Sequence, residues 1–201
     1  MKLQIESQQL EDYLKEIPNL IEFHSPLVSE KIKAIQAKTS NKKEQAELAF
    51  KIARDEIAHS FDSQNLRVSI SAEETLKNKD GICFAKAHLL AALLRGLEIP
   101  TGFCYQRVLK KGNIESGYAL HGLNAVYLKE IGWFRVDPRG NKEGINSQFT
   151  TDVEQLAYPI RKELGEIDYL KVLTNPLPSV ITAMKNSANT QELFDKRPES
   201  L

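Results

Sequence analysis

The spacing of apolar residues along the chain changes from helical to strand-like at about Pro100. Before this point, apolar residues recur every three or four positions, as they do on the buried face of an amphipathic helix. Among other helices, this spacing predicts one over residues 44–59 and one over residues 71–78. The second begins with Ser71 and Glu74, which have the spacing of a capping box. We expect these helices to form a scaffold.

Beyond Pro100, alternating side chains predict strands. The alternation is clear in residues 103–108, and two further strands follow over residues 118–128 and 132–136. The loops between them are short, so the three strands are expected to form an antiparallel meander. Cys104 lies in the first of these strands, where the simplest interpretation is a buried core residue.

Residues 80–95, with the sequence DGICFAKAHLLAALLR, predict a tight turn followed by an apolar helix. Gly81 suits the turn, which places Cys83 in the first turn of the helix. There, free backbone N–H groups and the positive end of the helix dipole favour a thiolate over a thiol. The same N–H groups can also hold an oxyanion. A single cysteine is, however, more often a small buried apolar residue, so the nucleophile hypothesis needs support from elsewhere.

Composition narrows the class of protein. The 201 residues suit a single domain over 1–201, and 41% hydrophobic and 27% charged residues are ordinary globular values. Lysine plus arginine equals aspartate plus glutamate at 27 each, so we expect neither nucleic acid nor a membrane as a partner. We find no signal peptide or membrane span, which makes a cytoplasmic protein the default. The two cysteines are treated as free thiols, and we expect no metal or cofactor.

His121 and Asp137 are the candidates to support a Cys83 nucleophile, because a thiol needs an imidazole as base and the imidazole needs an acceptor. A hairpin centred on Lys129 would place His121 opposite Asp137. A turn centred between residues 130 and 131 would instead place Asn124 opposite Asp137, and the sequence leaves both registers open. The other histidines considered, at positions 59 and 88, are interpreted as structural.

Several stretches together resemble the core of the transglutaminase-like superfamily. They are Gly81–Ala85, Leu93–Pro100, His121 and Gly132–Pro138, preceded by a helix ending in Arg54–Asp62. Gly102–Gln106, His121–Val126 and Arg139–Asn141 look like a bacterial branch of compact proteins within it. The resemblance covers about residues 45–140, which leaves a helical N-terminal extension, 1–44, and a C-terminal extension, 141–201.

The resemblance implies a papain-like α+β fold, in which the helix carrying the cysteine packs on an antiparallel sheet carrying the histidine and the aspartate. It implies Cys83 as nucleophile, His121 as general base and acid, and Asp137 as the residue that orients the imidazole. The Cys83 backbone N–H is the one oxyanion donor that can be named. Calcium binding, known in some animal members, finds no suitable acidic cluster.

Members of the superfamily act on amides, so we expect thiol-dependent acyl transfer on a protein or peptide substrate. Hydrolysis, as in a peptidase or amidase, is preferred here, because the sequence offers no second domain or acidic surface to supply an amine. The alternatives are cross-linking of glutamine to amines, deamidation, or an inactive binding module with the same fold. The expected substrate contacts are Tyr105, Gln106, Trp133 and Asn141.

Overall fold

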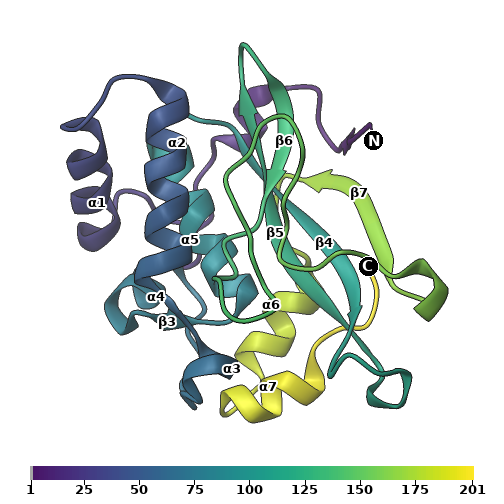
Figure 1. Ribbon diagram of the computed structural model, residues 1–201. Helices are drawn as coiled ribbons and strands as arrows, with labels where there is room; N and C mark the ends of the chain where they lie inside the picture. Colours follow the sequence, from purple (N-terminus) through teal and green to yellow (C-terminus); the bar gives the residue numbers. More distant parts are fainter. Residues whose placement is uncertain (1) are drawn as a thin grey trace.

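The structure, a computed structural model that describes residues 2–201, has an α+β fold in which helices pack against a five-stranded sheet (Figure 1). The α-helices are α1 (Pro26–Gln36), α2 (Lys42–Lys51), α3 (Ser60–Ser63), α4 (Ala72–Asn78), α5 (Cys83–Gly96), α6 (Pro178–Lys185) and α7 (Thr190–Lys196). The strands are β1 (Gln4–Ile5), β2 (Ala58–His59), β3 (Asp80–Gly81), β4 (Thr101–Leu109), β5 (Tyr118–Leu128), β6 (Gly132–Val136) and β7 (Ile167–Leu173). Short helical turns are η1 (Leu10–Tyr13), η2 (Ile52–Glu56), η3 (Ile114–Ser116) and η4 (Lys162–Leu164).

The five-stranded sheet has the order β1-β7-β4-β5-β6. Strands β4, β5 and β6 form the antiparallel meander that the alternation predicts. The sequence did not predict β7, which comes from the C-terminal part of the chain and pairs with the free side of β4. Strand β1 then pairs in parallel with β7, so a strand near the N-terminus and one from the C-terminal part of the chain lie side by side at one edge of the sheet.

Helix α5 lies inside the molecule, and every residue from Cys83 to Arg95 is buried. Its three polar side chains beyond the first turn, Lys86, His88 and Arg95, bind backbone carbonyl groups of other segments. The carbonyls belong to Arg54 and Ile57 for Lys86, to Ile70 for His88, and to Lys15, Thr101 and Thr174 for Arg95. These contacts satisfy the buried donors and attach the surrounding chain to the helix.

The helix predicted over residues 44–59 ends earlier than expected. Helix α2 gives way to one π-helical turn, η2, and the chain is extended at β2. The buried ammonium of Lys86 accounts for this change, because it binds the carbonyls of Arg54 and Ile57 at the point where the helix stops. His59 is therefore not at a helix C-terminus; it directly precedes α3 and pairs across β2 and β3 with Gly81.

The first turn of α5 lies directly against β5 at Gly122. A Cβ atom placed on Gly122 would be 2.6 Å from Cδ1 of Phe84, the residue that follows Cys83. Further along the same two elements, Nδ2 of Asn124 donates a hydrogen bond to the carbonyl of Ala87 at 3.2 Å. The absence of a side chain at residue 122 thus allows the start of α5 to approach the strand that carries His121.

None of the helices within residues 2–201 is both long and apolar enough to cross a lipid bilayer.

We predict that Gly122→Ala destabilises the fold by about 1–3 kcal/mol, the usual cost of overpacking a core, because the added methyl group overlaps the Phe84 ring. Chemical denaturation measures the free energy of unfolding. The double variant with Phe84→Leu serves as the control, since the smaller side chain removes the overlap and should recover part of the loss. Additive losses in the double variant would contradict the proposed contact.

Candidate active site

Cys83, His121 and Asp137 come together where the start of α5 meets the sheet. Nε2 of His121 lies 2.7 Å from Oδ2 of Asp137. The thiol of Cys83 lines the same cavity as this imidazole and is close enough for the charge of His121 to lower its pKa, while Nδ1 is the ring nitrogen not bound to Asp137. All three residues are buried, with Asp137 fully enclosed. A thiol, an imidazole and a carboxylate are thus arranged in series, as nucleophilic thiol chemistry requires.

The strand register that brings His121 near Asp137 is neither of the two considered from the sequence. The hairpin is centred on Glu130, so that Leu128 pairs with Gly132 and Asn124 pairs with Val136. Both predicted registers were therefore wrong. In the structure, the loop consists of residues 129–131. The turn therefore begins one residue later than in a hairpin centred on Lys129.

The electrostatics of this group favour an ion pair. Burial raises the pKa of the Cys83 thiol, but the charge of His121 and hydrogen bonds from His121 and the Gly122 backbone reverse this and lower the pKa below its ordinary value. Burial lowers the pKa of His121, yet the charges of Asp137 and Cys83 raise it to about 10. Both shifts favour the thiolate–imidazolium pair over the neutral thiol and imidazole.

Asp137 is held in place by the backbone around it. Burial raises the pKa of its carboxyl, but the charge of His121 and the hydrogen bonds that the carboxylate accepts lower it. The backbone N–H of Arg139 donates to Oδ1 at 3.1 Å, and that of Ala157 donates to Oδ2 at 3.0 Å. The ring of Tyr158 then packs edge-on against the imidazole, with the ring centres 4.8 Å apart. These contacts fix the orientation of the imidazole.

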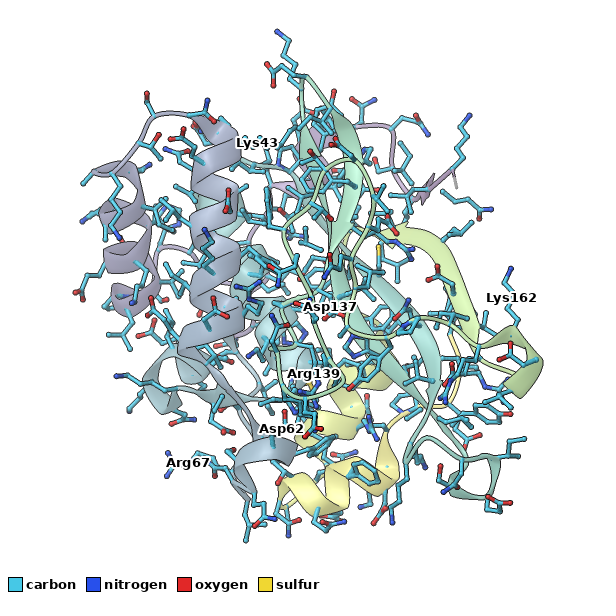
Figure 2. The ribbon with its side chains drawn as sticks, in the orientation of Figure 1. Lys43, Asp62, Arg67, Asp137, Arg139 and Lys162 are labelled. Atoms are coloured by element: carbon cyan, nitrogen blue, oxygen red, sulfur yellow. The ribbon has the colours of Figure 1, made fainter. Side chains whose placement is uncertain are left out.

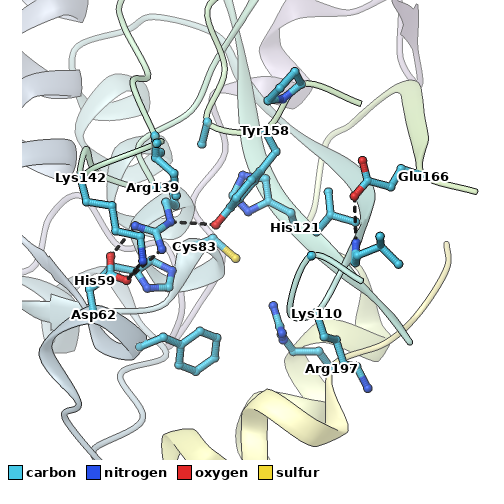
Figure 3. A pocket seen from close by; sticks show the side chains of 18 of the residues that line it. His59, Asp62, Cys83, Lys110, His121, Arg139, Lys142, Tyr158, Glu166 and Arg197 are labelled. Carbon is cyan, nitrogen blue, oxygen red and sulfur yellow. Dashed lines mark hydrogen bonds and ion pairs between the residues drawn. The ribbon is translucent and has the colours of Figure 1, made fainter. Parts of the chain in front are cut away.

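Cys83 and His121 line a cavity of about 480 Å³ (Figure 3). Several further lining side chains were not recognised from the sequence as site residues, among them His59, Asp62, Tyr158 and Arg197. They come from β2, α3, the segment before η4 and the position directly after α7, respectively. Among these further cavity residues, the sequence pointed only to those in the stretches around Asp62 and Arg139, because both stretches belong to the motifs that resemble the superfamily.

Arg139 connects the Asp137 end of the site to α3. Its guanidinium pairs with the carboxylate of Asp62, and its Nε donates to the hydroxyl of Tyr158 at 2.9 Å. Lys142 also reaches Asp62, at 2.6 Å. Figure 2 shows Asp137, Arg139 and Asp62 following one another from the sheet toward α3. This chain of contacts builds one wall of the cavity.

His59 lies in the same cavity as a neutral imidazole. Burial, followed by the nearby charge of Arg139, lowers its pKa well below the ordinary value. Its Nδ1 is buried and has no hydrogen-bond partner among residues 2–201. A buried ring nitrogen without a partner is unusual, and here it belongs to a side chain at the wall of the cavity that holds Cys83.

The four expected substrate contacts do not lie in this cavity. Tyr105 is buried, and its hydroxyl accepts a hydrogen bond from the backbone of Leu177. Gln106 is buried and donates to Asp168. The other two residues also have local partners: Trp133 packs against Tyr13 and Tyr127, and Asn141 binds the backbone of Ser147. The expectation assumed that these side chains face the start of α5, whereas the structure uses them for packing and loop contacts.

Both cysteines are free thiols in the structure. Cys104 is fully buried in β4, and burial raises its pKa to about 12. The residues that the structure describes include no group of three or more His, Cys, Asp or Glu side chains placed to hold a metal ion.

The fold and the site define a class: an α+β protein of papain-like architecture, with a cysteine at a helix start and a histidine on the adjoining sheet. A family model for the transglutaminase-like superfamily matches residues 30–138, and the chain belongs to this superfamily.

A crystal structure of a candidate cysteine protease from Cytophaga hutchinsonii is similar to this chain. The two are 18% identical with a TM-score of 0.46, over 66% of this chain and 43% of that chain. This chain therefore matches less than half of the length of that protein. The comparison with curated proteins gives no match.

We predict that iodoacetamide modifies Cys83 much faster than Cys104 at pH 7, because the pKa of Cys83 is lowered and that of Cys104 is raised to about 12. His121→Ala removes the main charge that lowers the Cys83 pKa, and should shift the reactivity of Cys83 to higher pH. Peptide mass mapping across a pH series measures both rates. A profile for Cys83 that is unchanged in the variant would contradict the ion pair.

Proposed function

We propose that the protein is a thiol-dependent amide hydrolase, a peptidase or amidase, in which Cys83, His121 and Asp137 form a catalytic triad. The observation that carries this proposal is the contact between the three side chains at the wall of a cavity. In such a site, the chemistry requires an accessible carbonyl carbon next to the thiolate and a proton donor next to the leaving nitrogen. The cavity beside Cys83 and the imidazolium of His121 meet these two requirements.

The reaction proceeds in two halves. The Cys83 thiolate forms a bond to the carbonyl carbon of the amide, and the carbon–nitrogen bond breaks as His121 gives its proton to the leaving amine. Neutral His121 then takes a proton from water, the hydroxide adds to the acyl group, and the carbon–sulfur bond breaks to release the acid. Asp137 keeps the imidazole oriented and stabilises its charged form in both halves.

The oxyanion formed in each half needs hydrogen-bond donors. The backbone N–H of Cys83 lies in the first turn of α5, where N–H groups have no partner within the helix. As the second donor we propose His59. Its imidazole is neutral, it has an unpartnered buried nitrogen, and its strand pairs with Gly81, two residues before Cys83. A neutral imidazole carries one N–H group, which is what this role requires.

Water is favoured over an amine as the acceptor by the charge of the cavity. Five cationic side chains line it, against two carboxylates; the cations are Lys110, Arg139, Lys142, Arg161 and Arg197, and the carboxylates are Asp62 and Glu166. A lysine or polyamine is an ammonium ion at neutral pH, and this lining repels it. Water carries no such penalty. This observation supports hydrolysis over cross-linking.

We predict that the protein converts a glutamine-containing peptide to the free acid or to cleaved fragments, even when a primary amine is present. Mass spectrometry of the products with and without the amine distinguishes the reactions. Cys83→Ala should abolish turnover, whereas Cys104→Ala, which removes a thiol outside the cavity, should retain it. An amine adduct as the main product would replace hydrolysis by transamidation, and turnover by Cys83→Ala would contradict the whole proposal.

A second prediction concerns His59. Loss of one oxyanion donor typically lowers kcat by about 10²–10³-fold, so we expect a loss of this size in His59→Ala. Alkylation of Cys83 by iodoacetamide has no tetrahedral intermediate, and its rate should be nearly the same in the variant and the wild type. His59→Gln retains an N–H donor and should recover part of kcat. An equal loss in alkylation and turnover would instead assign His59 a purely structural role.

A further inference from the structure

Arg197, which follows α7, presents an unpaired cation to the cavity that holds Cys83. The residue is nine-tenths buried, with 9% of its surface exposed, and it lines the cavity. Its guanidinium lies over the rings of Phe61 and Phe194, 5.1 and 4.5 Å from their centres. Nε donates to the carbonyl of Phe194, but the buried Nη2 has no hydrogen-bond partner among residues 2–201. A buried guanidinium nitrogen without a partner is costly unless a ligand supplies one.

The carboxylates of the cavity are already used by other cations. Asp62 binds both Arg139 and Lys142, and Glu166 binds Arg161. Neither of them pairs with Arg197. No carboxylate that lines the cavity is therefore left to pair with Arg197, and one that enters from outside can do so.

Arg197 is held close to the reacting groups. The backbone N–H of Leu120, which precedes His121, donates to the carbonyl of Pro198 at 2.6 Å. This bond ties the residue after Arg197 to the strand that carries the imidazole. The charges of Cys83 and Arg197 also act on each other: after burial, the thiolate is the largest influence on the pKa of Arg197, and Arg197 helps to lower the pKa of Cys83. Figure 3 shows the Arg197 side chain at the wall of the cavity opposite Tyr158.

We propose that Arg197 binds a carboxylate of the substrate, and that the substrate is an amide with a carboxylate near the scissile carbonyl. The inference rests on the proposed hydrolysis at Cys83. A planar guanidinium held over two aromatic rings suits this task, because it can donate two parallel hydrogen bonds to a carboxylate. The carboxylate can belong to an acidic side chain or to the C-terminus of a peptide, since both offer the same chemistry.

Two alkylating reagents that differ in charge test the inference without a known substrate. Iodoacetate carries a carboxylate and iodoacetamide a neutral amide, while both alkylate the thiolate. We divide the rate of Cys83 alkylation by iodoacetate by the rate with iodoacetamide, and divide this ratio by the same ratio for glutathione. The result should be about ten in the wild type. Arg197→Gln should bring it to about one, and Arg197→Lys to a value in between.

Arg67→Gln is the matched control, because Arg67 is exposed, binds Asn78 and lies outside the cavity (Figure 2). This variant makes the same change in net charge and should retain the wild-type ratio. A ratio that is the same in the wild type and in both Arg197 variants would overturn the inference and leave hydrolysis standing. A Cys83 that reacts with neither reagent would overturn the proposed function, and this inference with it.

Peptide pairs then identify the source of the carboxylate. One pair compares glutamate with glutamine beside the cleaved bond, and the other compares a free C-terminus with a C-terminal amide. We expect one acidic member to be preferred about tenfold in kcat/KM, and the preference to disappear in Arg197→Gln but not in Arg67→Gln. Equal turnover of acid and amide in both pairs would contradict the inference.

Discussion

The burial of α5 on all sides is the constraint on which the rest of the structure depends. A helix that carries Lys86, His88 and Arg95 can be buried only if each of these donors finds an acceptor, since an unpaired buried donor costs roughly 1–3 kcal/mol and more when charged. The acceptors are backbone carbonyls from segments before and after the helix in sequence. The same contacts that satisfy the helix therefore determine where η2 and β2 lie, near the end that carries Cys83, and where β4 begins, near the end that carries Arg95.

Two histidines line the cavity that holds Cys83, and their pKa values are shifted in opposite directions for identifiable reasons. His121 lies between Asp137 and Cys83, two groups that are negative when ionised, and its pKa is raised to about 10. His59 is buried to a similar extent but is near Arg139 and Lys86, and its pKa is lowered. Burial lowers the pKa of both rings; at His121 the neighbouring negative charges outweigh it, whereas at His59 the nearby cations add to it. A site that needs one charged proton donor and one neutral hydrogen-bond donor can obtain both from the same residue type.

Patterns local in sequence predicted α5, the meander and the meeting of Cys83, His121 and Asp137. Of the two registers left open, the hairpin centred on Lys129 was wrong by two residues and the other by one. A shift of two leaves each side chain on the same face, so His121 and Asp137 still meet as in the first register, whereas a shift of one would not. The failures are non-local. Strand β7 joins the sheet 58 residues after β4 ends, and no short-range pattern shows that Arg197 returns to β5. Tyr105 and Trp133 are aromatic residues of ordinary strands, and only the packing of the whole fold decides which cavity such side chains face.

The place of β7 in the sheet also has a consequence for the growing chain. Residues 83–137, which contain the thiol, the imidazole and the carboxylate, are made before the strand that covers the free side of β4. Until Ile167–Leu173 leaves the ribosome, β4 is an edge strand with unpaired backbone groups, open to pairing with other chains. The segment with Arg197 and Pro198 docks on β5 later still. A nascent chain thus carries its nucleophile before it carries the wall around it, and both the sheet and the cavity wall are completed only when these later segments have emerged.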